Sequence, residues 1–174
     1  MSRADSRPEG RARLRLPVLV ASGLGSGFTR LAPGTFGSLA ALLPGILLSR
    51  HPAALVAAIL AVCAAGLWAI PRATGGADHG WVVVDEVAGQ WITLLGVPPL
   101  VVPATGGAVL HQIAWAVAAF VTFRLLDITK PGPIAALDRR HDALGVMGDD
   151  VLAGVLGAML LGLLQLVLRA GSPA

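Results

Sequence analysis

Long stretches without a charged residue constrain this chain more than any other feature. Residues 31–48, 52–71 and 151–168 contain no Asp, Glu, Lys or Arg. As helices they would be about 27–30 Å long, close to the roughly 30 Å hydrocarbon core of a bilayer. Hydrophobic residues make up 55% of the 174 residues and charged residues 13%, which is more apolar surface than a small soluble core needs. The sequence therefore predicts an integral membrane domain, with one crossing in each of these stretches.

A fourth uncharged stretch, residues 87–123, is too long for a single crossing. Its 37 residues would form a helix of about 55 Å. Prolines and glycines interrupt it at Pro98, Pro99, Pro103, Gly106 and Gly107. We predict two short crossings, near 87–103 and 108–123, with a re-entrant pair as the alternative. The expected fold is all-α, a compact multi-helix membrane bundle with about four to five spanning or re-entrant helices.

The charges lie outside these stretches, and many of them lie in a basic tail. Residues 1–15 contain five arginines, at positions 3, 7, 11, 13 and 15. They precede the apolar part instead of alternating with aromatic residues on a folded face, so nucleic acid is not an expected partner. We interpret residues 1–15 as a cytosolic tail and 16–170 as a single helical domain. The apolar run 16–21 is too short for a signal-peptide core, and the single Cys63 implies no disulfide framework.

Arginine and lysine also predict the orientation of the domain. With a cytosolic tail, a topology of five crossings puts most other cations on the cytosolic side and leaves only Arg50 and Arg169 outside. The cytosolic cations are Arg30, Arg72, Arg124, Lys130, Arg139 and Arg140. The same topology brings four short motifs to the cytosolic face, although hydropathy alone does not require this. They are residues 33–35, Asp85 with Glu86, Asp127, and Asp149 with Asp150.

The acidic residues at the ends of the apolar stretches are candidate functional groups. Carboxylates that converge at one interface repel one another unless a cation neutralises them. Oxygen ligands suit Mg²⁺ or Ca²⁺ better than zinc, and the four histidines lack metal-ligand spacing. Helix capping is the structural alternative for the two acidic pairs, but not for Asp127, which follows a span. The candidate ligands are Asp85, Glu86, Asp127, Asp149 and Asp150.

A glycine-rich segment, residues 22–27, is a candidate phosphate-binding loop. Backbone N–H groups of such a loop just before a helix can hold a phosphate, which makes Gly25 and Gly27 candidates. Additional donors would be Arg30, Thr35, Ser38, Arg124 and Lys130. The segment has no dinucleotide-binding spacing and no Walker lysine follows it, so a flexible turn explains the loop better when it is taken by itself.

Five motifs in order carry a resemblance to a known family. They are residues 23–27 (GLGSG), 32–38 (APGTFGS), 85–89 (DEVAG), 123–134 (FRLLDITKPGPI) and 145–154 (GVMGDDVLAG). With these motifs, residues 18–168 resemble bacterial phosphatidylglycerophosphatase A. Each motif is short, and their order over nearly the whole chain makes the resemblance specific.

The resemblance implies a Mg²⁺-dependent phosphatase in the bacterial cytoplasmic (inner) membrane, crossing it several times with its site facing the cytosol. It would convert phosphatidylglycerophosphate in the cytoplasmic leaflet to phosphatidylglycerol and phosphate. Glu86, Asp127, Asp149 and Asp150 would be catalytic, and these four together with Asp85 would bind the metal. Phosphate would be held by Arg124, Lys130 and Thr35. The resemblance leaves the oligomeric state open.

Alternative mechanisms and functions follow from the same residues. We expect direct attack by water activated at the metal, because Cys63 lies in mid-span without a histidine partner. An aspartyl-phosphate on Asp127 or Asp149 is the alternative. A CDP-alcohol phosphotransferase-like enzyme should show paired aspartates three and four residues apart on one helix, and neither spacing occurs at the inner end of a span. A transporter with an acidic cation site should carry its acids near the middle of the bilayer in inverted repeats, which the sequence lacks.

Overall fold

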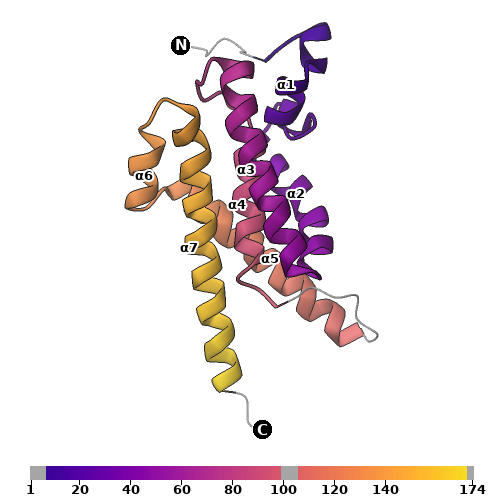
Figure 1. Cartoon of the computed structure of the whole chain (residues 1–174). Helices are drawn as coiled ribbons and strands as arrows, with labels where there is room; N and C mark the ends of the chain where they lie inside the picture. The colour runs from indigo at the N-terminus through magenta and orange to yellow at the C-terminus, as the bar shows by residue number, and fades with distance from the viewer. Residues whose placement is uncertain (1–6, 99–105, 172–174) are drawn as a thin grey trace.

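The computed structural model describes residues 7–98 and 106–171, and these contain helices and no β-strand. The predicted all-α class is confirmed. Two short 3₁₀ helices, η1 (Gly10–Leu14) and η2 (Ser26–Phe28), flank α1 (Leu16–Ala21). The remaining helices form the bundle of Figure 1. They are α2 (Pro33–Ser49), α3 (Pro52–Thr74), α4 (Val84–Leu94), α5 (Gly106–Thr129), α6 (Pro133–Asp138) and α7 (Ala143–Ala170).

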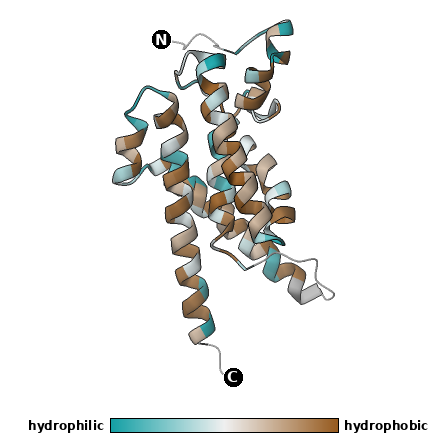
Figure 2. Cartoon of the chain, in the orientation of Figure 1, coloured by the Kyte–Doolittle hydropathy of each residue, from teal (hydrophilic) through white to brown (hydrophobic). Residues whose placement is uncertain are grey.

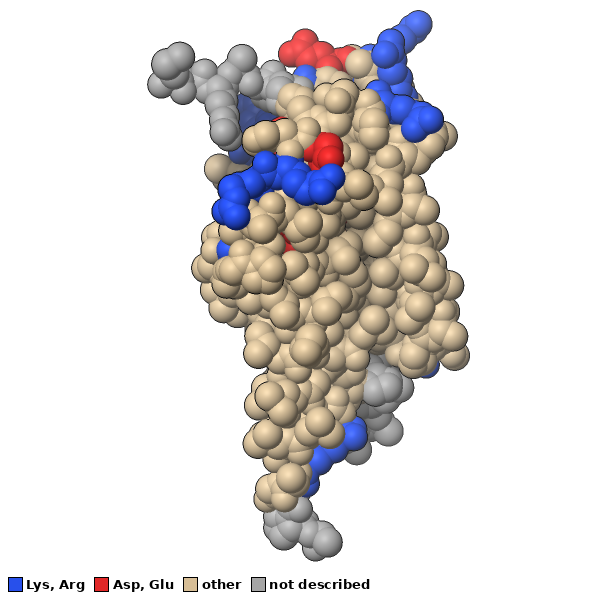
Figure 3. All heavy atoms as spheres, turned by 60° about the vertical axis from the view of Figure 1, so that its left-hand side comes forward, with Lys and Arg blue, Asp and Glu red and all other residues tan. Residues whose placement is uncertain are grey.

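Three helices of the described part are long and apolar enough to cross a membrane. They are α3, α5 from Val109 onward, and α7, and α2 is a shorter apolar helix of 17 residues. Apolar residues cover the long helices, and hydrophilic residues gather near the end where α7 begins (Figure 2). The space-filling view shows most charged side chains at that end, above a broad uncharged belt (Figure 3). This distribution is typical of a membrane protein.

The predicted crossing at 87–103 does not form as one helix. α4 ends at Leu94 after 11 residues, about 16 Å, so it reaches only part of the way across a bilayer core. The prediction also includes residues 99–105, which lie outside the described part of the chain. α5 begins at the opposite end of the bundle from the start of α7 (Figure 1). The chain therefore passes from one end of the bundle to the other between the start of α4 and the start of α5, and of the described residues 84–98 only Val84–Leu94 are helical.

The short helix α4 is the centre of the bundle. It packs against α2, α3, α5 and α7, and eight of its 11 residues are buried. Glycines let the backbones of α4 and α7 come into contact. A side chain would not fit there, since a Cβ atom built on Gly154 would lie only 2.5 Å from the carbonyl oxygen of Gly89. One built on Gly96 would lie 2.6 Å from Cα of Ala158. In an apolar solvent, where burial does not drive helices together, such close packing is a main source of association.

The orientation of the bundle can be tested with single cysteines in a Cys63→Ser background. Arg139 follows α6 and His51 separates α2 from α3, and both are exposed, at opposite ends of the bundle (Figure 1). The positive-inside bias predicts that a membrane-impermeant thiol reagent added to intact cells labels His51→Cys and spares Arg139→Cys. Labelling of both variants in opened cells is the control. Preferential labelling of Arg139→Cys in intact cells would invert the orientation.

The contact between α4 and α7 can be tested with two glycines of the same helix. Gly154→Ala should destabilise the bundle by about 1–3 kcal/mol, since the new methyl group meets backbone that cannot move aside. Gly162→Ala is the matched control, because its Cβ would lie 4.0 Å from the nearest atom, the carbonyl oxygen of Gly96. Thermal unfolding in detergent measures both effects. Equal stability of the two variants would show that the contact is not tight.

Candidate active site

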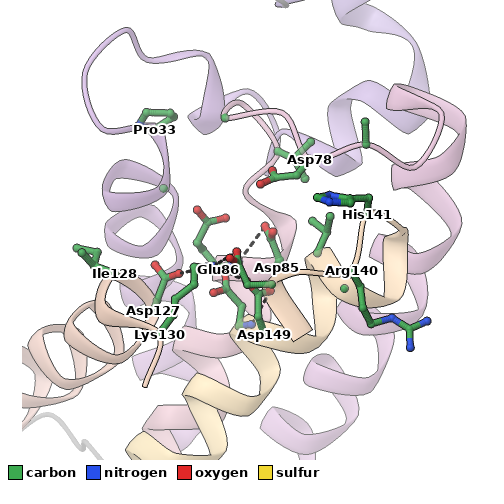
Figure 4. Close-up of a pocket in the computed structure, with 18 of the residues that line it drawn as sticks. Pro33, Asp78, Asp85, Glu86, Asp127, Ile128, Lys130, Arg140, His141 and Asp149 are labelled. Atoms are coloured by element: carbon green, nitrogen blue, oxygen red, sulfur yellow. Dashed lines mark hydrogen bonds and ion pairs between the residues drawn. The ribbon is translucent and has the colours of Figure 1, made fainter. Parts of the chain in front are cut away.

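A cavity of about 800 Å³ opens at the end of the bundle where α7 begins. It lies where α2 and α4 begin and α5 ends, with α6 and the segment before α4 at its rim. Ten of its lining residues are labelled in Figure 4. Acidic side chains from three helices face one another inside it. They are Asp85 and Glu86 of α4, Asp127 of α5, and Asp149 and Asp150 of α7.

Each helix delivers its acids from a defined turn. Asp85 and Glu86 lie in the first turn of α4, and Asp127 lies in the last turn of α5. Asp149 and Asp150 lie in the second turn of α7, beside Gly89 of α4. A Cβ atom built on Gly89 would lie 2.6 Å from the carbonyl oxygen of Asp150. The close approach of α4 and α7 thus sets the spacing of these two acidic pairs.

Helix capping does not explain the acidic pair of α7. The N-cap of this helix is Asp142, whose Oδ1 accepts a hydrogen bond of 2.8 Å from the backbone N–H of Gly145. Asp149 and Asp150 therefore lie inside the helix. α4 begins after Val83, which provides no side-chain cap. Asp85 accepts only from the neighbouring N–H of Glu86, at 3.1 Å, so it does not act as an N-cap either.

Three of the carboxylates have the spacing of a metal site. One oxygen from each of Asp85, Glu86 and Asp150 lies within 4.8 Å of the others. Oε2 of Glu86 is buried without a hydrogen-bond partner among the described residues. Buried polar atoms rarely remain unsatisfied, so this oxygen indicates an additional occupant. The donors are all carboxylate oxygens, which are the ligands that a hard divalent cation prefers.

The first turn of α4 holds carboxyl groups that resist ionisation. The pKa of Glu86 is raised to about 8, chiefly by burial and also by nearby Asp150 and Asp127, against the opposing effects of a hydrogen bond with Asp85 and of Arg124. Burial also raises the pKa of Asp85 well above its usual range, and Glu86 adds to this effect. A cation bound between these groups would favour their charged forms. The electrostatics of the protein alone are thus unfavourable for the charged cluster.

Arg124 compensates part of the negative charge. Its Nη1 forms an ion pair with Asp127 and lies 4.0 Å from Oε1 of Glu86. The same nitrogen lies 3.5 Å from the hydroxyl oxygen of Ser38, which in turn donates a hydrogen bond of 2.8 Å to the carbonyl oxygen of Gly34. Nε of Arg124 is buried and has no hydrogen-bond partner in the part of the chain that the structure describes. The guanidinium group thus ties α5 to α2 and keeps one donor available.

Lys130 compensates the charge on the other side of the cluster. Its Nζ forms an ion pair with Asp149, lies 2.7 Å from Oδ1 of Asp138, and lies 4.0 Å from Oδ1 of Asp127. Burial lowers the pKa of Lys130, but the bonds to Asp138 and Asp149 outweigh this effect and raise it. Its backbone has φ +45°, a left-handed conformation that costs a non-glycine residue about 1–3 kcal/mol. The ion pairs supply the tertiary contacts that hold it there.

The glycine-rich loop lies outside the cavity lining. Gly25, Gly27 and Arg30 are not among the lining residues, and Thr35 and Ser38 lie on the first turns of α2 without lining it. The side chain of Ser26 closes the loop on itself by donating to the carbonyl oxygen of Gly23, at 2.9 Å. A Cβ on Gly27 would meet the backbone of Trp81. The loop therefore supports the segment that precedes α4, and a role of its glycines in phosphate binding stays a prediction.

The structure adds residues that the sequence did not indicate. Asp78 and His141 line the cavity, and Asp138 is a partner of Lys130. These residues lie in loops or in the short helix α6, where no periodic pattern marks them. Gln90 lies one turn after Glu86 on α4 and is fully buried, and neither atom of its side-chain amide has a hydrogen-bond partner within residues 7–98 and 106–171. Gln90 could have been identified from the sequence, because it is a polar residue inside the uncharged stretch 87–123.

The family model and two of the curated relatives agree with one another. The family model for phosphatidylglycerophosphatase A matches residues 19–165. The chain is 38% identical to phosphatidylglycerophosphatase A of Escherichia coli, over 82% of this chain and 80% of that protein. It is 35% identical to phosphatidylglycerophosphatase A of Haemophilus influenzae, over 92% of this chain and 96% of the relative.

A third relative, from Bacteroides thetaiotaomicron, has the provisional name phosphatidylinositol-3-phosphatase and is 39% identical, over 88% of this chain and 96% of that protein. No solved structure matches the chain. The family match covers the motifs that deliver all five acids of the cavity together with Arg124 and Lys130. The chain belongs to the phosphatidylglycerophosphatase A family.

Proposed function

We propose that this protein hydrolyses the terminal phosphomonoester of phosphatidylglycerophosphate, giving phosphatidylglycerol and phosphate for phospholipid synthesis. Family membership supports the reaction and the substrate. The observation that carries the proposal is the triad of Asp85, Glu86 and Asp150 in a cavity at one end of an apolar bundle. A lipid substrate presents its phosphate at the membrane surface, and a cavity at the end of apolar helices is suited to receive it there.

The cofactor we propose is Mg²⁺, held by Asp85, Glu86 and Asp150, with Asp127 and Asp149 beside it. The oxygen-only donors and the unpartnered Oε2 of Glu86 fit such an ion. When bound, Mg²⁺ would neutralise charge on the phosphate oxygens and make a water molecule more acidic.

The side chains of the cavity account for the remaining steps. Arg124 and Lys130 lie beside the acids and can bind the phosphate oxygens by exchanging part of their present ion pairs. Asp127 and Asp149 lie outside the triad and are available to take the proton of the attacking water. The water oxygen forms a bond to phosphorus, the bond from phosphorus to the glycerol oxygen breaks, and that oxygen is protonated. We favour water over an aspartyl-phosphate because the sequence contains no DxDx motif of the kind that forms such an intermediate.

We propose that the protein crosses the bacterial cytoplasmic (inner) membrane several times, with the cavity facing the cytosol and the substrate in the cytoplasmic leaflet. The apolar helices support the membrane location, and the cation bias supports the orientation. Family membership favours this function over a CDP-alcohol phosphotransferase. The position of the acids at helix ends favours it over a transporter.

Metal dependence is the first test of this proposal. Purified protein in detergent should release phosphate from phosphatidylglycerophosphate. Chelation should abolish the release, because the five acids of the cavity then lack their compensating cation. Addition of Mg²⁺ should restore it. Phosphatidylinositol 3-phosphate should be assayed in parallel, since one relative has a name that refers to that lipid. Full turnover in excess chelator would rule out the metal site. Faster turnover of the inositol lipid would reassign the substrate.

Substitution of the acids separates chemistry from helix capping. Asp127→Asn and Asp150→Asn should each lower kcat by at least about 100-fold, because the amide keeps the shape but loses the charge. Unfolding temperatures should stay the same or rise, since like charges no longer repel one another. Asp142→Asn is the matched control, because Asn caps a helix as well as Asp does, so kcat should stay within about two-fold. Near-normal turnover of both cavity variants would place the chemistry elsewhere.

A further inference from the structure

The cavity has two unlike sides. Ala32 and Pro33 at the start of α2, and Ile128 in the last turn of α5, line it on one side. Figure 4 shows Pro33 and Ile128 to one side of the acids and Asp78 and His141 to the other. One side of the cavity is therefore apolar, and the other carries loop residues with charged and polar groups.

The apolar side continues onto exposed apolar surface. Ile128 is 66% exposed and Leu125, one turn earlier on α5, is 57% exposed. Leu31 is 79% exposed immediately before α2, and Phe36 is 47% exposed one turn into that helix. In a membrane helix, large exposed apolar side chains face lipid. The rim of the acidic cavity thus meets the lipid between the start of α2 and the end of α5.

The opening between these helices is confined to their ends. Deeper in the bundle, a Cβ on Gly34 would lie 3.3 Å from Nη1 of Arg124, and this nitrogen lies 3.5 Å from Ser38. Gly34 lies in the first turn of α2 and Ser38 in the second, so these contacts close the space between the helices directly below Pro33. Above them, Ala32 has φ +43° and turns the chain into the helix without a side chain large enough to fill the space. The gap therefore lies at the very start of α2, beside the last turn of α5.

We infer that the glycerophospholipid substrate reaches the acids sideways, between the first turn of α2 and the last turn of α5. Its acyl chains stay on the apolar surface formed by Leu31, Phe36, Leu125 and Ile128, and only the headgroup enters the cavity. The released phosphate leaves on the side of Asp78 and His141, which are loop residues. This inference rests on the proposed function and assigns its substrate a path.

A second cavity, of about 530 Å³ and lined mainly by apolar residues, offers an alternative binding place for the acyl chains. It lies among α1, α2, α3 and α4, and Val20, Ala40, Val87 and Trp91 are among its lining residues. It is large enough for an acyl chain, but it shares no lining residue with the acidic cavity. The headgroup of a lipid held there would be separated from the acids of the first cavity. The gap between α2 and α5 is favoured because its own residues line the acidic cavity.

Two tryptophan substitutions at exposed helical positions discriminate between the paths. Ile128→Trp narrows the proposed opening, and Ala40→Trp fills the rival cavity. With phosphatidylglycerophosphate in vesicles, kcat/KM should fall at least about ten-fold in Ile128→Trp and stay within about two-fold in Ala40→Trp. Unfolding temperatures of both variants show that each is folded. An equal effect of the two substitutions, or a larger effect of Ala40→Trp, would overturn the inference.

Photolabelling tests the path without relying on a variant. A phosphonate analogue of the substrate, with a diazirine on the acyl chain near the headgroup, should label residues 31–36 and 125–128 of the unsubstituted protein. Labels confined to residues 16–24 and 84–91, beside the rival cavity, would overturn the path. The proposed function fails separately, if the unsubstituted protein releases no phosphate from the lipid. A protein that releases phosphate but is labelled elsewhere keeps the function and loses the path.

Discussion

The contact between the backbones of α4 and α7 is the constraint on which the site depends. Gly89 and Gly154 remove the side chains that would otherwise separate the two helices, and Thr93 donates a hydrogen bond of 3.0 Å to the carbonyl oxygen of Gly89 beside the contact. The acidic turns of both helices are thereby brought within ligand distance. α4 is too short to cross a bilayer and packs against four other helices, so its position comes from packing and not from its length.

A buried cluster of five carboxyl groups is electrostatically unfavourable by itself, and two neighbouring cations reduce the repulsion within it. Arg124 and Lys130 contribute two positive charges against five carboxyl groups, and both are fixed by contacts to more than one helix. The left-handed backbone of Lys130 shows that part of the folding free energy goes into placing this cation. The remaining imbalance is the reason why we propose a divalent cation for the cavity, and why we expect the cluster to bind phosphate only when that cation is present.

In the proposed function, the position of the cavity at one end of the bundle gives this chemistry access to a lipid. Helix ends supply the acids, so the polar groups gather at that end and the apolar lengths of the same helices extend away from it. A site deeper in the bundle would require the charged headgroup to leave water completely. The two unlike sides of the cavity then match the two parts of a phospholipid.

The sequence by itself determined the class of the fold, the location of most spans and the acids that converge. Uncharged stretches and the bias of the cations report directly on partition between water and lipid, which is a property of short segments. The tertiary structure decided what depends on packing: that α4 ends at Leu94, that Asp142 and not Asp149 caps α7, and that Lys130 is held by Asp138. It also placed the glycine-rich loop behind α4 instead of in the cavity. These features rest on contacts between residues far apart in the chain, whose energies no local pattern of hydropathy or charge contains.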